Sequence, residues 1–215
     1  FRAVIFDLDG VLTDTARFHY LAWKQLADQL GIAFDESFNE RLKGVGRMDS
    51  LQLILEHGNQ QLTPAECHHL AQQKNDYYRE LITQLSPQDL LPGALISLQQ
   101  LGAQGIPLAL ASASQNAPDI LHRLGLHGFF HAVADPTKVT QGKPHPAIFL
   151  TAAQLLDVPP RFCLAVEDSQ AGIAAIKSAG MYALGIGNSD DLHAADEVIQ
   201  DLSQFDLERY QWHIG

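Results

Sequence analysis

The sequence has few cysteines and few basic residues, and each shortage narrows the range of functions. Cys67 and Cys163 are its two cysteines, and they have neither metal-ligand spacing nor the density of a disulfide scaffold. Lysine and arginine number 14 against 25 acidic residues, which gives a formal net charge of −11. This charge disfavours nucleic acid and anionic membrane surfaces as partners, although a small anionic substrate remains compatible with it.

Long apolar runs are absent as well. No stretch is long enough to cross a bilayer, and no basic segment followed by an apolar one marks a leader peptide. Hydrophobic residues make up 46% of the chain and charged residues 18%, as in an ordinary soluble globular protein. We therefore expect a cytoplasmic protein with unreactive thiols. Its length allows one domain, or one domain with an insertion.

A helical pattern follows the first apolar strand, which we predict at Ala3–Phe6. No convincing second strand occurs before about residue 86. Thr63, Pro64 and Glu66 form a capping-box pattern with proline at the first helical position, which is a strong start signal. The spacing of apolar residues predicts helices at about 15–30, 38–42, 49–55 and 63–85.

From about residue 91 onward, apolar strands alternate with helices. Strands are expected at 107–112, 131–135, 162–166 and 182–187, and helices at 94–104, 117–124, 146–156 and 169–179. Apolar strands separated by helices indicate a parallel sheet covered on both faces. We predict a doubly wound α/β core, residues 1–14 and 87–215, with an all-helical domain inserted after the first strand, residues 15–86. Two connections join them, as a hinged lid needs.

Four polar stretches end strands of the predicted sheet and should meet at one edge of it. They are Asp7-Leu8-Asp9, Ser112-Ala113-Ser114, Lys143-Pro144 and Glu167-Asp168-Ser169. Two unit charges about 4 Å apart repel by about 4 kcal/mol at an effective dielectric near 20, so the clustered carboxylates need a cation. Hard oxygen ligands without cysteine or histidine favour Mg²⁺.

The same edge offers groups for an anion. The Ser112 hydroxyl and the amides that follow it can hold a phosphate oxygen, and Lys143 can add a positive charge. Each residue also has an ordinary interpretation, with Ser112 in a loop, Lys143 in solvent and Glu167-Asp168 as a helix cap. These ordinary interpretations do not explain why all four stretches should meet at one edge of the sheet.

The order of these stretches resembles the four motifs of the haloacid dehalogenase superfamily of phosphoryl-transfer enzymes, over the whole chain. The helical insertion is similar to the cap of that superfamily, which follows the first strand. Finer similarity is to its β-phosphoglucomutase family. The stretches that carry it are Phe6 to Thr15, Phe38-Asn39-Glu40, Leu42-Lys43-Gly44-Val45, Arg47, Lys74-Asn75-Asp76, Ala111-Ser112-Ala113-Ser114 and Glu167 to Ile173.

The resemblance implies roles for the core residues. Asp7 would be the nucleophile that forms an aspartyl phosphate, and Asp9 the general acid and base. Ser112 and Lys143 would hold the transferring phosphoryl group. The implied ligands of Mg²⁺ are Asp7, the main-chain carbonyl of Asp9, Asp168, and Glu167 directly or through water.

The resemblance also implies a second phosphate site in the cap, because a mutase must hold a bisphosphate while excluding water. Arg47 is the best candidate for it, since its fork can bind phosphate through two hydrogen bonds. Lys43 and the amides of Gly44, Val45 and the next glycine would assist. The alternative is a solvated basic pair at a helix start.

Other cap residues have implied roles near the substrate. His19 would lie near Asp9 and Trp23 against the sugar, although a surface histidine and a core tryptophan are alternatives. Thr15, which can also cap the first helix with Gly31 ending it, would act as a hinge. Lys74 would line the cleft.

One position departs from the resemblance. Gln115 stands where the best-known mutases have lysine, so the cleft loses a positive charge. Ser114 and Asn116, on either side, are retained as substrate-binding residues. The change puts the strength of sugar-phosphate binding in doubt rather than the phosphoryl chemistry.

The leading hypothesis is interconversion of β-D-glucose 1-phosphate and D-glucose 6-phosphate through an aspartyl phosphate and β-D-glucose 1,6-bisphosphate. Its partners would be sugar phosphates and bisphosphates, with no nucleic acid or membrane, and the chain would act as a monomer. A Mg²⁺-dependent sugar-phosphate or phosphoglycolate-type phosphatase is the alternative. A third hypothesis, a non-catalytic phosphometabolite-binding module, is disfavoured by the intact pair Asp7 and Asp9.

Overall fold

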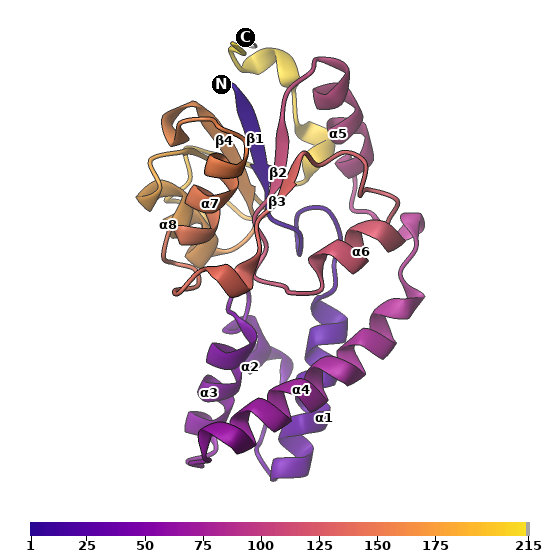
Figure 1. Cartoon of the computed structure of the whole chain (residues 1–215), viewed down its shortest axis with the longest axis vertical. Coiled ribbons are helices and arrows are strands. Elements are labelled where there is room, and N and C mark those ends of the chain that lie inside the picture. Colours follow the sequence, from indigo (N-terminus) through magenta and orange to yellow (C-terminus); the bar gives the residue numbers. More distant parts are fainter. Residues whose placement is uncertain (214–215) are drawn as a thin grey trace. The chain divides into compact units, whose positions relative to one another are not determined.

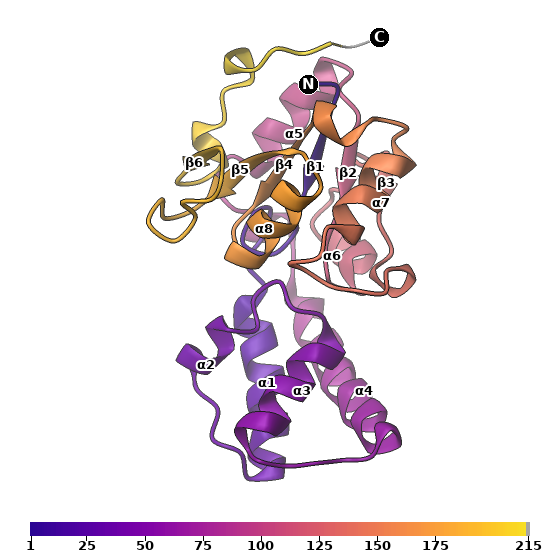
Figure 2. The same ribbon diagram turned by 90° about the vertical axis from the view of Figure 1, so that its left-hand side faces the viewer.

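The computed structural model describes residues 1–213. It divides into two compact units, one built from Phe1–Asp14 and the chain from Leu85 onward, the other from Thr15–Gln84. Figures 1 and 2 show a sheet with helices in the first unit and helices alone in the second. The helical unit therefore ends at Gln84, two residues before the expected boundary.

The first unit is built on a six-stranded parallel sheet in the order β3-β2-β1-β4-β5-β6. The strands are β1 (Ala3–Phe6), β2 (Leu108–Leu110), β3 (Ala132–Val133), β4 (Cys163–Glu167), β5 (Tyr182–Ile186) and β6 (Glu197–Ile199). This arrangement confirms the predicted α/β fold. The sequence analysis did not predict β6, since three residues beginning with glutamate are a weak apolar signal.

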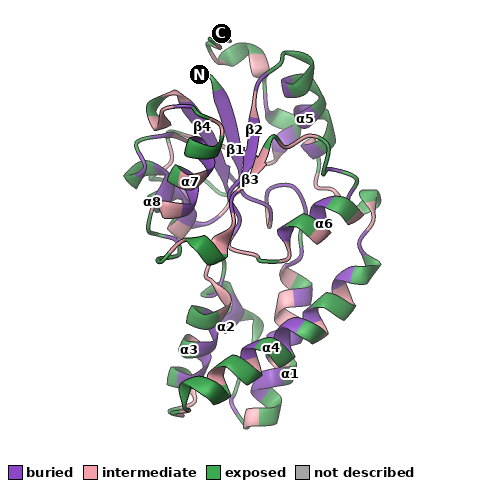
Figure 3. Cartoon of the chain, in the orientation of Figure 1, coloured by how far each residue is buried: buried purple, intermediate pink, exposed green. Residues whose placement is uncertain are grey.

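Helices cover both faces of the sheet. They are α5 (Ala94–Ala103), α6 (Ala117–Arg123), α7 (Ala147–Leu155) and α8 (Gln170–Ser178). α7 and α8 lie on one side, and α5 and α6 on the other (Figures 1 and 2). On the α7 and α8 side the strands present small residues, Ala109, Ala165 and Ala183, to a continuous core. Strands buried on both faces explain their unbroken apolar sequences (Figure 3).

The helical unit consists of α1 (Ala16–Leu30), α2 (Glu36–Glu40), α3 (Arg47–His57) and α4 (Pro64–Leu81). Its core is an apolar cluster that includes Leu26, Phe34, Phe38, Ile54 and Leu55. Each residue of that cluster lies on a helix or beside one, so the unit has an apolar core of its own.

Short 3₁₀ turns complete the fold. They are Ile82–Gln84, Pro87–Asp89, Pro136–Lys138, Pro160–Phe162, Leu202–Gln204 and Leu207–Arg209. None of the helices between residues 1 and 213 is long and apolar enough to span a membrane.

Helix ends follow the predicted signals with two corrections. Thr63 accepts a hydrogen bond from the Glu66 amide, the Glu66 carboxylate accepts one from the Thr63 amide, and α1 ends at Gly31 in a left-handed conformation, as predicted. Thr15 lies at the N-cap of α1, but its side chain makes no capping bond to that helix. α3 begins at Arg47 rather than at residue 49 or 50, because the preceding glycine, in extended conformation, supplies the N-cap.

Candidate active site

The register of the sheet brings the ends of three strands to one level. Phe6 in β1 pairs with Leu110 in β2 and with Val166 in β4. The Asp7 amide donates a hydrogen bond to the Val166 carbonyl at 2.9 Å, so Asp7 and Glu167 leave neighbouring strands together. Ser112 lies two residues after Leu110, the last residue of β2 that pairs with β1. The carboxyl edge of the sheet therefore collects the predicted polar groups.

A lysine bridges two of the carboxylates. Lys143, in the loop before α7, places its Nζ 2.8 Å from Asp7 Oδ1 and 2.7 Å from Glu167 Oε2. All three residues are at least 94% buried. Buried charges are stable only with partners, and in this triad the Lys143 ammonium is paired with both carboxylates. Two carboxylates against one ammonium leave a net negative charge.

Glu167 is held from every side. Its Oε1 accepts hydrogen bonds from the Asp168 amide at 3.1 Å, the Ser169 amide at 3.0 Å and the Ser169 hydroxyl at 2.9 Å. Gly172, in the first turns of α8, leaves space for the same carboxyl, since a Cβ there would lie 2.0 Å from Glu167 Cδ. The carboxylate is therefore fixed by its own loop and by the start of the next helix.

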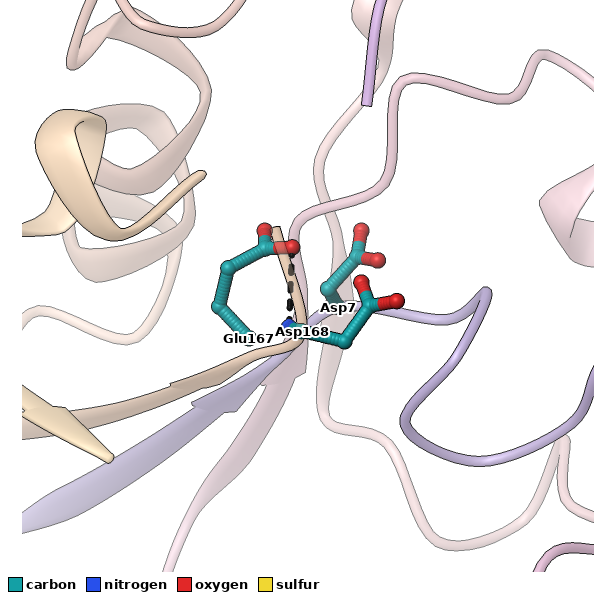
Figure 4. A group of neighbouring side chains, drawn as sticks. All are labelled: Asp7, Glu167 and Asp168. Carbon is teal, nitrogen blue, oxygen red and sulfur yellow. Dashed lines mark hydrogen bonds between the residues drawn. The ribbon is translucent and has the colours of Figure 1, made fainter. Parts of the chain in front are cut away.

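Three carboxylates form a group that can hold a metal ion. Asp7, Glu167 and Asp168 each offer one oxygen, and these oxygens lie within 4.8 Å of one another. Figure 4 shows the three side chains at the strand ends, with the bond from the Asp168 amide to Glu167 dashed. Gly10, with φ at +77°, leaves room for Asp168, whose Oδ2 would lie 2.0 Å from a Cβ at that position.

The donor set fits a hard divalent cation. Three carboxylates and one ammonium sum to a charge of about −2, which such an ion balances. Asp9 was predicted to contribute its main-chain carbonyl, and its carboxylate is outside this group. A divalent metal site is thus supported by the chemistry of Asp7, Asp168 and Glu167, while the identity of the metal is a separate question.

Burial and neighbouring charges shift the pKa values of Asp7 and Lys143. Burial and the neighbouring Glu167 charge raise the pKa of Asp7 to about 7, against the opposing effect of Lys143. Burial alone would lower the pKa of Lys143, but the Asp7 and Glu167 carboxylates outweigh it and raise that pKa. Lys143 is therefore a permanent cation at neutral pH, and Asp7 exchanges a proton near neutrality.

The loop after β2 is shaped by successive hydroxyls. Ser112 Oγ accepts a hydrogen bond from the Ser114 amide at 3.1 Å, and Ser114 Oγ accepts one from the Asn116 amide at 3.2 Å. Because a hydroxyl that accepts keeps its own proton, the buried Ser112 can still donate to a phosphate oxygen. The Ser114 hydroxyl stabilises the turn that leads into α6.

In the helical unit, a buried lysine lies among aromatic rings. Lys74 Nζ is 2.9 Å from His19 Nδ1, 4.5 Å from the ring centre of Trp23 and 4.7 Å from that of Tyr78. The His19 and Tyr78 rings stack with centroids 4.1 Å apart. The predicted residues His19, Trp23 and Lys74 therefore form one cluster. Tyr78 was missed, although it follows Lys74 by four positions on α4.

The basic loop places its two cations differently. Arg47 is the first residue of α3, where burial lowers its pKa and Asp76 of α4 acts in the opposite direction. Lys43 Nζ pairs with Glu40 at 3.0 Å on an exposed surface, a contact of little energy. A cation at a helix N-terminus opposes the helix dipole, and the Asp76 charge offsets part of this cost at Arg47.

The sequence profile of the haloacid dehalogenase-like hydrolase family matches residues 1–180. The chain belongs to this family. It is 52% identical to the β-phosphoglucomutase of Bacillus subtilis (strain 168) over 209 residues, which cover 96% of this chain and 92% of that protein. Membership and near-complete coverage agree with the fold described above.

Two further similarities refine the comparison. A crystal structure of β-phosphoglucomutase from Clostridium difficile matches with a TM-score of 0.95 and 44% identity, over 97% of this chain and 94% of that one. A fructose-1-phosphate phosphatase of Escherichia coli (strain K12) is 31% identical over 186 residues, covering 86% of this chain and 96% of the phosphatase. The family thus includes both mutases and phosphatases similar to this protein.

The sequence analysis did not predict the contributions of three core residues to the site. Ser169 was predicted only as the start of a helix, yet its hydroxyl also donates to Glu167. Gly10 and Gly172 were part of quoted stretches without a stated reason. Gly172 had a usable signal, because a glycine inside a predicted helix often marks close packing.

Proposed function

We propose that the protein is a β-phosphoglucomutase, which interconverts β-D-glucose 1-phosphate and D-glucose 6-phosphate through β-D-glucose 1,6-bisphosphate. The observation that carries this proposal is the 52% identity with the Bacillus subtilis β-phosphoglucomutase over nearly the whole chain. The buried Asp7, bridged by Lys143 and next to Glu167 and Asp168, supplies the groups that phosphoryl transfer requires.

Asp7 is the nucleophile in the proposed reaction. Its carboxylate attacks phosphorus and forms an aspartyl phosphate, while Lys143 neutralises charge on the phosphoryl group and Ser112 donates a hydrogen bond to it. Asp7, Asp168, Glu167 and the main-chain carbonyl of Asp9 would hold Mg²⁺, which when bound offsets the negative charge of the phosphoryl oxygens. Lys143 must leave part of its present pairing to serve the phosphate.

Asp9 moves the proton. It protonates the sugar oxygen that leaves as Asp7 is phosphorylated, and it takes the proton from the sugar hydroxyl that later attacks the aspartyl phosphate. General acid and base catalysis of this kind contributes about 10²–10⁴ in rate. The same residue serves both directions, as reversibility requires.

The helical unit, residues 15–86 with the connections included, is the proposed cap. Arg47 binds the phosphate that is not being transferred, assisted by Lys43 and the amide of Gly44. The Val45 amide, which was also predicted to assist, donates a hydrogen bond to the Leu42 carbonyl at 3.1 Å. The cluster of His19, Trp23 and Lys74 binds the sugar, and Thr15 is the hinge. The core is residues 1–14 and 87–215, and the enzyme works as a monomer in the cytoplasm.

A Mg²⁺-dependent sugar-phosphate phosphatase is the second candidate. The similarity to the Escherichia coli fructose-1-phosphate phosphatase favours it, because the same core residues could transfer the phosphoryl group to water. A phosphatase needs no site for a second phosphate. The Arg47 position is therefore the feature on which the two candidates differ most.

The test compares Arg47→Ala with Arg79→Ala, which removes the same charge from an exposed position on α4. We expect Arg47→Ala to lower glucose 6-phosphate formation by about 10- to 100-fold, the value of a lost charged phosphate contact. Phosphorylation of Asp7 by acetyl phosphate should stay within about twofold of wild type, since that donor has one phosphate. Full mutase activity in Arg47→Ala would contradict the assignment.

A further inference from the structure

Thr13 lies fully buried between two segments of the first unit. Its hydroxyl donates a hydrogen bond to the Asp89 carbonyl at 2.8 Å. Its main chain forms an antiparallel bridge with Leu90, and the Leu91 amide donates to the Leu12 carbonyl at 2.9 Å. The end of the first loop is thereby fastened to the segment that follows the helical unit in sequence.

Thr13 also closes the turn that carries Asp9. The Thr13 carbonyl accepts a hydrogen bond from the Gly10 amide at 2.8 Å, and Asp9 and Thr13 form a β-bridge. The Thr13 amide donates a hydrogen bond to the Leu8 carbonyl at 3.3 Å. The position of Thr13 therefore fixes where Asp9 and Gly10 lie.

Gly10 links the same turn to the metal-binding group. Its left-handed backbone faces Asp168 so closely that a Cβ would lie 2.0 Å from Asp168 Oδ2. A shift of the turn by even half an ångström would change this clearance and the direction of Asp9. Geometric errors of about 1 Å at a reacting group can cost about 100-fold in rate.

The acceptor for the Thr13 hydroxyl is itself rigid. Asp89 Oδ2 accepts hydrogen bonds from the Ser86 amide at 2.8 Å and the Ser86 hydroxyl at 3.1 Å. The Ser86 hydroxyl in turn accepts one from the Gln88 amide at 3.3 Å. The Asp89 side chain therefore closes a capping box, which fixes the residue whose main-chain carbonyl accepts from Thr13.

A role in packing alone is the simpler explanation for a buried threonine. Valine would fill the same volume, but the Asp89 carbonyl would lose its donor, and a buried hydrogen bond without replacement weakens the local structure. Packing predicts that valine costs every reaction equally. A role through the Asp9 carboxyl predicts the larger cost where a proton must move, once Mg²⁺ is saturating.

We propose that Thr13 is a positioning residue for Asp9, which it holds by joining the Asp9 turn to the Asp89 capping box. The inference rests on the proposed function, because the proton transfer by Asp9 is part of it. Thr13 touches neither substrate nor metal in this scheme. It acts through the hydrogen bonds of Gly10 and Asp89.

The experiment compares Thr13→Val and Thr13→Ser with two phosphoryl donors. β-Glucose 1-phosphate releases a sugar oxygen that needs a proton, whereas acetyl phosphate releases acetate, which needs none. Thr13→Val should lower kcat with the sugar phosphate by about 10- to 100-fold, a part of the usual acid/base contribution. At saturating Mg²⁺, phosphorylation of Asp7 by acetyl phosphate should stay within about twofold, and Thr13→Ser should recover sugar-phosphate turnover to within about threefold.

Equal losses with both donors, or no recovery in Thr13→Ser, would overturn the proposal. If Thr13→Val fails to fold, Asp89→Ala provides the test, because it opens the capping box and should produce the same selective loss at smaller size. The proposed function is judged separately on the wild type. If the wild-type protein releases phosphate instead of forming glucose 6-phosphate, the proposal of a mutase is wrong. The role of Thr13 can then still be tested, with phosphate release as the measured rate for both donors.

Discussion

The Asp7 carboxyl lies in surroundings that raise its affinity for a proton. Burial and Glu167 raise its pKa to about 7, although Lys143 is 2.8 Å away. A group with a raised pKa holds its proton over a wider pH range, so protons compete with a metal ion for it. The metal and the proton are therefore alternatives at one oxygen.

Magnesium affinity should consequently depend on pH. Below about pH 7, each unit of acidification should weaken Mg²⁺ binding by about tenfold, because Asp7 must lose its proton to become a ligand. Isothermal titration at about pH 8 and about pH 5.5 measures the difference. Equal affinities at the two pH values would contradict the proposed role of Asp7 as a ligand. Asp7→Asn should bind weakly at both.

Gly172→Ala should disturb Glu167 directly. The added Cβ would lie 2.0 Å from Glu167 Cδ, so α8 or the carboxylate must move, and overpacking of this kind costs about 1–3 kcal/mol. Gly102→Ala is the matched control, since a Cβ there meets no other residue within 4 Å, and it should be neutral or stabilising. Urea unfolding compares the two. Similar stabilities would show that the Gly172 site is not crowded.

At the level of single residues, the core site was largely predictable. The approach of Asp7 and Glu167 followed from a simple rule, that parallel strands end at a common edge. Lys143 was expected at a strand end as well, but it lies in the long loop between β3 and α7 and reaches the two carboxylates from there. Hydrogen bonds inside a loop follow no such rule. The Ser169 hydroxyl on Glu167 and the Thr13 hydroxyl on Asp89 depend on backbone paths that a sequence pattern does not specify.

At the level of elements, strong local signals were reliable and weak ones were not. The capping box at Thr63 and the left-handed Gly31 gave correct helix ends, because each has one conformation that satisfies its hydrogen bonds. β6 is three residues long and depends on pairing with β5 rather than on its own composition. The start of α3 was misplaced because a glycine N-cap has no side chain to read.

The Thr63 cap gives a test at this level. Thr63→Ala should reduce the free energy of unfolding by about 0.5–2 kcal/mol, whereas Thr63→Ser keeps the hydroxyl and should lose little. The two hydrogen bonds from Thr63 lower the pKa of Glu66, so the contribution is present at neutral pH and is lost as pH falls through that lowered value. Thermal unfolding at neutral and acid pH checks both statements. A Thr63→Ala penalty that is unchanged in acid would contradict the role of the carboxylate.

For the whole molecule, the small number of cations is informative. Fourteen basic residues in a chain of net charge −11 cannot make a general anion-binding surface. Lys143 and Lys74 are both buried in the clusters described above, and Arg47 is the first residue of α3. A protein with so few cations in such places is suited to small phosphorylated molecules rather than to polyanions.

The organisation into two units was predictable from the change of pattern near residues 15 and 86. The observed division at Thr15 and Leu85 differs slightly, and hydrogen bonds of Asp89 and Leu91 with Thr13 and Leu12 tie the second connection to the first unit. What the sequence pattern leaves open is which acceptor the phosphoryl group meets. That choice separates a mutase from a phosphatase.

The direct measurement uses the wild-type protein with β-glucose 1-phosphate, Mg²⁺ and a trace of β-glucose 1,6-bisphosphate. We expect glucose 6-phosphate to form, and the trace of bisphosphate to accelerate it, since the bisphosphate phosphorylates Asp7 and is regenerated in each cycle. Inorganic phosphate as the main product would contradict the mutase and identify water as the acceptor.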